Sequence, residues 1–417
     1  MKLRILASSL LAICTAGSAF AGTHALLPPQ QGDMVPSVLL VKTSANGISP
    51  MAQPASQVHV ERKPLSVSWP LPHDAPLQSV PVPFARDSRE YWTDVSASEL
   101  QQGIKLPLSA PGAIIRLSPS DSSGGRLQPA NVRIQLGRQS LTVDHAASQI
   151  ADTQSLRAAG MDVPEASMVV RLNPELGAGM ATLQAPAASG RYVVHVFEPL
   201  SPFTVTALGD RGDLLVGHGV HVRVAMHDGD RSVPLSAVGG FMRAPDGNTT
   251  LLEFQRQTDG SFTVDARPNA IPSTAGLWEV HSFTVGTDAA GNEVRRDTTT
   301  VFAAATPDAR LSGTAETMRA RDHGIDITLG VTALSASRYA VTGVLFGHDA
   351  SGRLVPAAFA QSAAWLPIGD SRLLLHYDAT SLAGITAPYE LHDLRLQDQP
   401  AIGLLEHRAL AMRIETL

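Results

Sequence analysis

The sequence contains almost no cysteine. The only one, Cys14, lies near the start of the chain, so disulfide bonds cannot staple the rest. A domain without disulfides depends on a sizeable hydrophobic core. Apolar residues make up 44% of the 417 residues, which excludes wholesale disorder. A chain of this length is expected to form about two to four domains.

A basic excess is missing as well. The formal net charge is −6, and removal of the two positive charges of Lys2 and Arg4 with residues 1–21 would change it to −8. Mild acidity without a basic run argues against nucleic acid as a partner. Beyond residue 21, no apolar run approaches the roughly 20 residues that a transmembrane helix needs. We therefore expect no transmembrane segment in the mature chain.

The signatures of common enzyme classes are also missing. The sequence has no H-E-x-x-H of zinc hydrolases, no G-x-S-x-G nucleophile elbow and no P-loop. These absences do not exclude a catalytic triad that is assembled from distant positions. They lower the odds of the common hydrolases and leave the question of enzymatic activity open.

Residues 1–21 have the three parts of a cleavable export signal. Two basic residues precede an apolar stretch at 5–14, and an A-x-A cleavage site ends at Ala21. The apolar stretch is too short to span a bilayer, which takes roughly 20 residues. Ile13 stands where a lipoprotein signal needs a small residue before the cysteine, which argues against a lipid anchor at Cys14. We expect cleavage after Ala21 and a periplasmic or extracellular mature protein.

Residues 22–90 are rich in proline, with eleven prolines between Pro28 and Pro83. Proline fixes φ and removes a hydrogen-bond donor, which disfavours a helix or a central strand. Short apolar pieces at 35–41 and 65–69 still suit edge strands. The pattern predicts an extended arm that packs on the globular part or is partly mobile, and a disordered leader is the alternative.

The remaining sequence predicts a mainly β protein. We expect a β-rich N-terminal domain at 91–201 with one or two short helices. Ser96 and Glu99 have the spacing of a capping box, and Gly103 suits the end of that helix. A second, longer helix is expected within the alanine-rich segment 145–159.

Residues 202–305 and 306–417 are expected to form two Ig-like antiparallel β-sandwich domains. Alternation of apolar and polar residues at 220–226 is typical of a half-buried strand. Short strands recur at roughly 10-residue spacing, with turn residues between them, which is typical of a sandwich. The cysteine pair of antibody domains is absent, so the resemblance concerns architecture alone.

Three stretches, 103–116, 276–303 and 337–377, resemble a family of exported proteobacterial proteins that is described only as a domain of unknown function. Members of this family carry a β-rich N-terminal domain followed by Ig-like modules. The resemblance implies a periplasmic or type II-secreted protein of undefined activity. It supplies no catalytic residues.

The best candidate metal site in the sequence is a local enrichment of imidazoles and carboxylates. Both groups are ligands for zinc, and carboxylates also bind calcium. The alternative is an exposed strand face that runs into an Asp-Gly turn, and it is favoured because His227 lies about 20 Å from His221 along a straight strand. No cofactor is expected otherwise. The candidate zinc or calcium ligands are His218, His221, His227, Asp228 and Asp230.

Tyr91 and Trp92 stand out because aromatic residues make up only 5% of the chain. Adjacent aromatics next to a proline-rich arm suit a carbohydrate or peptide platform. More often, such residues are core anchors, because each buries a large apolar area. The core interpretation is favoured here.

The leading functional hypothesis is an exported binding or scaffold protein for a protein or glycan partner. The alternative is a secreted hydrolase, with a metal-assisted version included, whose site lies in the N-terminal domain or at a domain joint, where pockets are common. A role in envelope assembly through strand-edge binding is equally compatible with the sequence.

Overall fold

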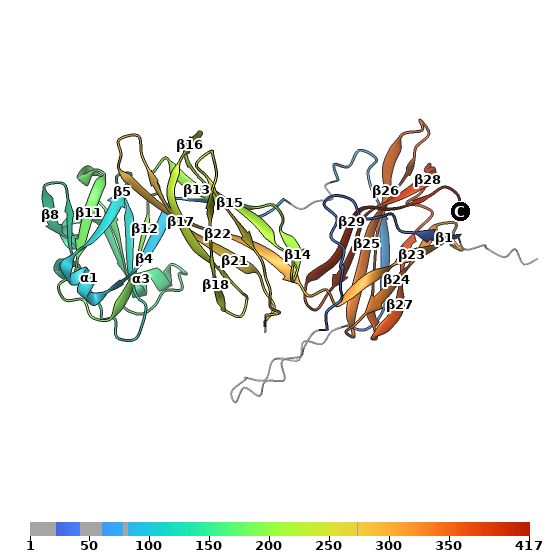
Figure 1. The fold of residues 1–417 in the computed structure, drawn as a ribbon, viewed down its shortest axis with the longest axis horizontal. Coiled ribbons are helices and arrows are strands. Elements are labelled where there is room, and N and C mark those ends of the chain that lie inside the picture. The colour runs from blue at the N-terminus through green and yellow to red at the C-terminus, as the bar shows by residue number, and fades with distance from the viewer. Residues whose placement is uncertain (1–21, 42–60, 78–81, 273) are drawn as a thin grey trace, which may run out of the picture. The chain divides into compact units, whose positions relative to one another are not determined.

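A computed structural model describes residues 22–41, 61–77, 82–272 and 274–417, and the predicted export signal lies outside these residues. The chain divides into two compact units. Unit 1 combines the N-terminal segment up to Val80 with Thr306–Leu417, and unit 2 spans Pro81–Ala305. Both units consist of β-sheets, and the short helices of the described residues lie in unit 2 (Figure 1). The predicted mainly β fold is confirmed.

The first half of unit 2 is a two-sheet sandwich, here called the first sandwich. One sheet has the order β4 (Glu90–Ser96), β12 (Arg191–Phe197), β6 (Ile114–Pro119), β10 (Met168–Leu172) and β9 (Ala147–Asp152). The other sheet has the order β5 (Ile104–Leu108), β11 (Gly179–Gln184), β7 (Arg133–Leu136) and β8 (Gln139–Thr142).

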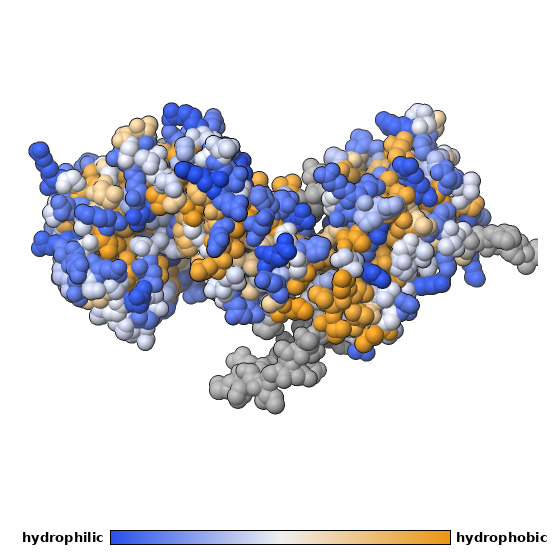
Figure 2. All heavy atoms as spheres, in the orientation of Figure 1, coloured by the Kyte–Doolittle hydropathy of each residue, from blue (hydrophilic) through white to orange (hydrophobic). Residues whose placement is uncertain are grey.

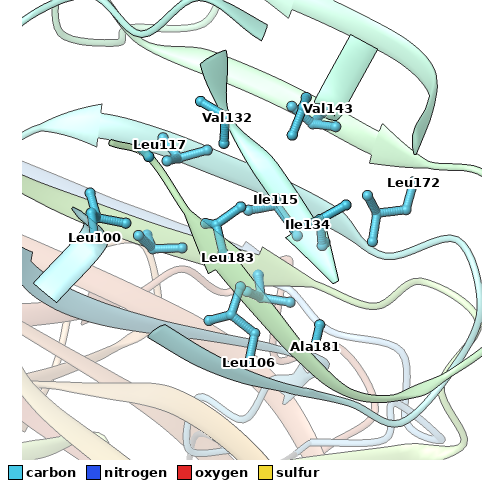
Figure 3. Close-up of a cluster of buried hydrophobic side chains, with 14 of the residues drawn as sticks. Leu100, Leu106, Ile115, Leu117, Val132, Ile134, Val143, Leu172, Ala181 and Leu183 are labelled. Atoms are coloured by element: carbon cyan, nitrogen blue, oxygen red, sulfur yellow. The ribbon is translucent and has the colours of Figure 1, made fainter. Parts of the chain in front are cut away.

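Apolar side chains from both sheets fill the first sandwich. Ile115 and Leu117 of β6 lie in the same cluster as Ile134 of β7 and Leu183 of β11, and each is almost fully buried. Figure 3 shows these side chains together between the sheets, with Leu100 at one end. Their two-residue spacing along each strand directs every second side chain into this core.

This sandwich contains three short helices, while the sequence predicted one or two. They are α1 (Ala97–Gln102), α2 (Val143–Ala146) and α3 (Thr153–Ala158). Two 3₁₀ turns, η1 (Pro129–Asn131) and η2 (Pro174–Leu176), accompany them. The predicted capping box is present: Ser96 Oγ accepts from Glu99 N, and the Glu99 carboxylate accepts from Ser96 N. The single longer helix predicted over 145–159 is wrong: only the six-residue α3 forms in its second half. Its first half forms β9, because pairing with β10 satisfies the backbone there and overrides the helix propensity of alanine.

The second half of unit 2 is the second sandwich. One sheet has the order β19 (Gln255–Arg256), β20 (Phe262–Ala266), β15 (Val220–Asp228), β13 (Phe203–Gly209) and β3 (Asp87–Ser88), and β16 (Arg231–Val233) also pairs with β15. The other has the order β14 (Asp213–Leu215), β22 (Glu293–Ala305), β21 (Trp278–Thr287), β17 (Leu235–Arg243) and β18 (Thr249–Leu252).

The alternation predicted at 220–226 appears in β15, where Val220, Val222 and Val224 are buried and His221 and Arg223 are exposed. All pairings in this sandwich are antiparallel except that of β14 with β22, which is parallel. The inward residues of both sheets form one apolar cluster.

The two sandwiches of unit 2 are joined by a buried ion pair. Arg296 of β22 lies 2.8 Å from the Glu198 carboxylate at the end of β12, and neither side chain has any exposed surface. Glu198 also accepts from the backbone N–H groups of Ser109 and Ala110, at 2.6 and 3.0 Å. Arg296 donates further to Ser201 Oγ at 2.7 Å. Each charge has several hydrogen-bond partners that compensate for its loss of water. The network therefore holds the two sandwiches in one arrangement.

Unit 1 is a third two-sheet sandwich, here called the C-terminal sandwich. One sheet has the order β1 (Gly22–Ala25), β23 (Ala309–Arg319), β24 (Ile325–Ala333) and β27 (Gly369–Tyr377). The other has the order β2 (Leu65–Pro70), β26 (Leu354–Leu366), β25 (Ser337–His348), β28 (Thr386–Asp398) and β29 (Gly403–Ile414).

The first part of the proline-rich segment links the two sheets of the C-terminal sandwich. After β1 pairs with β23, the chain crosses to β29, where Leu27 N donates to Ala411 O and Met34 forms a bridge with His407. Leu27 O accepts from Arg408, which forms a buried ion pair with Glu406. Strand edges that would otherwise be free are therefore covered by the chain itself.

The second part of this segment adds β2 to the other sheet. Arg338 donates to the carbonyl oxygens of Glu61 and Lys63, and the Trp69 ring packs on Phe359 at 4.8 Å. Hydrophobic side chains still reach the surface of this unit (Figure 2), and Val67 and Trp69 are among the exposed ones. Among the described residues, none of the helices has the length and apolar character that a bilayer crossing requires.

Candidate functional site

Unit 2 carries an unbroken line of five half-buried rings, here called the aromatic row: His195, Trp92, Phe283, Phe241 and His281. Successive ring centroids are 6.1, 6.3, 5.8 and 4.7 Å apart in that order. These spacings lie within the range of favourable ring pairs. The row starts on the first sandwich and ends on the second.

The strand register explains how the row forms. Phe241 of β17 pairs directly with His281 of β21, and Phe283 lies two residues farther along the same face. Trp92 of β4 pairs with His195 of β12, and the Trp92 ring meets Phe283 edge-on at 88°. Side chains of alternate residues on neighbouring strands share one face of a sheet. Trp92 and His195 therefore share one face of the β4–β12 sheet, and Phe241, His281 and Phe283 share one face of the β17–β21 sheet. The two faces meet where Trp92 contacts Phe283.

Each end of the row is a histidine paired with a glutamate. His195 Nε2 lies 2.9 Å from Glu90 Oε2, and His281 Nε2 lies 2.7 Å from Glu279 Oε2. The hydrogen bond with His195 lowers the pKa of Glu90 despite partial burial of its carboxyl. The row thus offers apolar ring faces between two carboxylates that accept hydrogen bonds.

Asp297 lies beside Phe283 and contacts the backbone of Trp92. It lies opposite Phe283 on β22, and its carboxylate accepts from Trp92 N at 2.8 Å. Burial raises the pKa of Asp297 to about 7, although this hydrogen bond acts in the opposite direction.

The sheet surface beside the row is open at Gly239. This glycine pairs with Phe283 on the same sheet face, and a Cβ atom added to it would meet nothing within 4 Å. The exposed position beside Phe283 and Phe241 is therefore open around a Cβ atom at Gly239.

The two adjacent aromatics singled out in the sequence have different places. Tyr91 is 1% exposed and its hydroxyl donates to Pro107 O at 3.1 Å, so it is a core anchor of the first sandwich. Trp92 points the other way, because neighbours on a strand face opposite sides, and its ring lies in the aromatic row.

The predicted metal ligands do not come together. His218 is exposed in the turn after β14, His221 pairs with Asp265 at 2.9 Å, and His227 lies at the far end of β15. Asp228 pairs with Arg231, and Asp230 lies in the turn between β15 and β16. Within the described ranges, no three His, Cys, Asp or Glu side chains are placed to hold a metal ion. The zinc or calcium hypothesis stays a prediction without a cluster to support it.

A pocket of about 360 Å³ opens next to the row, where the chain crosses from β18 to β19. Its lining includes His221 and Asp265, and also Leu251, which pairs with Phe241 of the row. The pocket and the row are therefore neighbouring features of the second sandwich.

Two family models match the sequence. The model described as the N-terminal domain of the domain of unknown function DUF4785 matches residues 56–198, and that of the DUF4785 C-terminal domain matches residues 308–415. Together they cover more than half of the chain. The chain belongs to the DUF4785 family.

A solved member of DUF4785 has the same fold. The crystal structure of a DUF4785 family protein from Legionella pneumophila matches with a TM-score of 0.70 and 19% identity, covering 94% of this chain and all of the other. A Bacillus licheniformis lipase in propeptide form matches with a TM-score of only 0.22 and 13% identity, over 58% of this chain and 42% of its own, and supports no conclusion. No curated protein sequence matches this DUF4785 chain.

Sequence reasoning on this DUF4785 protein missed four of the five rings of the row. One signal was available: Glu279, His281 and Phe283 alternate with buried residues along β21 and so share its outer face. The partners Phe241 and Trp92 could not be assigned to that face, because strand register over such separations is not encoded locally.

Proposed function

We propose that the protein is exported and acts as a binding or scaffold protein for a protein or glycan partner, with the aromatic row as its binding face. The observation that carries the proposal is the continuous row itself, which spans two sandwiches. Half-buried aromatic rings present large apolar area at low entropic cost and dominate many recognition surfaces.

The buried Arg296–Glu198 junction favours this function, because it holds the two sandwiches that contribute to the row. Trp92 comes from one and Phe283 from the other, and their contact needs a fixed junction. A surface that is already in its bound geometry loses less entropy when it binds.

One arrangement bears on the hydrolase alternative. Thr299 Oγ1 lies 3.1 Å from His281 Nδ1, and His281 Nε2 contacts Glu279, so a hydroxyl, an imidazole and a carboxylate are connected in the order of a catalytic triad. The backbone of β21 pairs with β17 on one side and β22 on the other. Its N–H groups are therefore engaged, and acyl transfer at Thr299 would need other donors to stabilise the oxyanion. Binding fits this surface better.

Gly239→Lys is expected to block the row. Gly239 is exposed and a Cβ atom has room there, so we expect the new side chain to extend into solvent, keep the ring contacts and obstruct the partner without unfolding the sheet. We expect the affinity for a partner captured from the envelope fraction to fall by about tenfold or more, as loss of a central aromatic contact does. Trp92→Ala is expected to have the same effect. Surface plasmon resonance on the full chain measures it.

Gly212→Lys is the matched control for this experiment. Gly212 lies in unit 2 before β14, and a Cβ atom added there also meets nothing within 4 Å. Equal loss of affinity in both glycine variants would contradict a binding role for the row. Turnover of an ester substrate that disappears in Thr299→Val would favour the hydrolase instead.

Export is expected to produce a chain that begins at Gly22. Gly22 is the first residue of β1 and pairs with Thr317, so cleavage after Ala21 leaves the strand complete. N-terminal sequencing of protein from the periplasm and from the culture supernatant tests this and separates the two compartments. Protein that is recovered only from the cytoplasm, with its first 21 residues attached, would contradict the proposal.

A further inference from the structure

The pocket beside the aromatic row has a mixed polar lining over an apolar floor. Met242 and Val264 of the core reach its base and are nearly buried. The walls carry two carboxylates, two basic groups and two side-chain amides: Glu253, Asp265, His221, Arg267, Gln255 and Asn269. A volume of about 360 Å³ lies within the range of small-molecule sites.

One side of the pocket is held in place by its own hydrogen bonds. His221 Nδ1 lies 2.9 Å from Asp265 Oδ1, and the backbone N–H of His221 donates to Asp210 at 3.0 Å. The pair sits on the neighbouring strands β15 and β20, which are in direct register at these residues. This side of the pocket is therefore preorganised.

The other side carries polar groups that the protein does not use. Glu253, Arg267 and Asn269 line the pocket, and none of their side chains has a hydrogen-bond or ion-pair partner among the described residues. They include a carboxylate that only accepts, a guanidinium that only donates, and an amide that does both. All three side chains are exposed, so a ligand that replaces the water on them must offer both donors and acceptors.

We propose that this pocket binds a sugar residue of a neutral glycan. A sugar hydroxyl both donates and accepts, so a pyranose matches the carboxylate, guanidinium and amide at once. Its C–H groups suit the small apolar area that Met242 and Val264 leave at the base of the pocket. The near balance of acidic and basic groups disfavours a phosphate or another multiply charged anion, which draws on clusters of arginine and lysine. This inference rests on the proposed binding function and names the ligand class for a surface next to the row.

A peptide that adds to the free edge of β18 is the competing occupant. Such a peptide pairs through backbone groups and needs a strand of useful length. β18 has only four residues, and short edge strands limit this kind of pairing. The side-chain chemistry of the walls therefore favours a glycan.

The test uses the full exported chain on a printed array of neutral and acidic oligosaccharides, followed by calorimetry with the best neutral ligand. Arg267→Ala and Glu253→Gln are each expected to weaken binding by about tenfold or more, as loss of a charge-assisted hydrogen bond does. Arg138→Ala and Glu175→Gln are the matched controls. Both lie on exposed positions of the first sandwich without a side-chain partner among the described residues, and both are expected to bind as the unaltered chain does.

The outcomes separate this inference from the proposed function. Glycan binding that survives Arg267→Ala and Glu253→Gln but is lost in Gly239→Lys would overturn the pocket and leave the row as the binding face. Absence of binding on the whole array, or a preference for acidic glycans, would overturn the inference about the pocket. The proposed function would still be supported if a protein partner bound through the aromatic row. Neutral glycan binding that is lost only in the pocket variants supports the inference.

Discussion

Arg296→Met is expected to destabilise unit 2 by about 3–5 kcal/mol, which is the usual result of removing one partner from a buried ion pair. The substitution leaves the Glu198 carboxylate with no exposed surface and without its charged partner. It also removes the hydrogen bonds that Arg296 donates to Ser201 Oγ and Phe203 O. A buried charge without compensation costs far more than the lost attraction alone.

The matched control is Arg191→Met. Arg191 pairs with Asp94 at 2.8 Å, but about half of each side chain is exposed, and such pairs contribute less than about 1 kcal/mol. Urea unfolding of the full chain, followed by amide hydrogen exchange to resolve unit 2, measures both variants. Similar losses for the two substitutions would show that the junction is no more important than a surface pair.

A second readout links the junction to function. Because Trp92 and Phe283 belong to different sandwiches, a loosened junction separates the two halves of the aromatic row. Arg296→Met is therefore expected to weaken partner binding even at temperatures where unit 2 remains folded. Combining it with Glu198→Leu is expected to recover part of the stability, because two apolar side chains leave no unpaired charge.

Local patterns of the sequence were sufficient for several elements. The alternation in β15 and the capping box of α1 both depend on residues only a few positions apart, and both are present. The helix expected over 145–159 failed for the opposite reason. Its alanines favour a helix in isolation, but β10 offers a partner strand that no local pattern reveals.

The candidate site depended on information that the sequence alone does not display. The neighbours Arg296 and Asp297 read as ordinary polar residues of a strand, yet both are buried, on opposite faces of β22. One meets Glu198 at the junction, and the other lies under Trp92. Burial on both faces arises because the first sandwich packs against the second, and no periodicity in β22 predicts that contact.

Asp297→Asn is expected to stabilise the protein at alkaline pH and to leave it nearly unchanged at about pH 4. In the folded chain, burial raises the pKa of Asp297 from its usual 3.8 to about 7. Between these values the folded state holds a proton that the unfolded state has released. Stability therefore falls as pH rises from about 4 to about 7 and is constant above that range.

The size of the effect follows from the shift. The rise in the pKa of Asp297 from 3.8 to about 7 lowers the free energy of unfolding at pH 8 by roughly 4 kcal/mol at most. Asparagine stays neutral, and its Oδ1 still accepts from Trp92 N, so the variant avoids this cost while keeping the contact under the row. Its added NH₂ group reduces the gain if it finds no acceptor.

Urea unfolding at a series of pH values from acid to alkaline measures the difference between Asp297→Asn and the unaltered chain. The control is Asp94→Asn, an exposed carboxyl on β4, the strand that also carries Trp92, which is expected to change stability little at any pH. The decisive observation is the slope: the unaltered chain loses stability between about pH 4 and pH 7 and the variant does so less steeply. Parallel pH profiles, or a variant that is less stable at pH 8, would show that Asp297 is ionised in the folded protein already near pH 4 and that the Trp92 contact stabilises its charge.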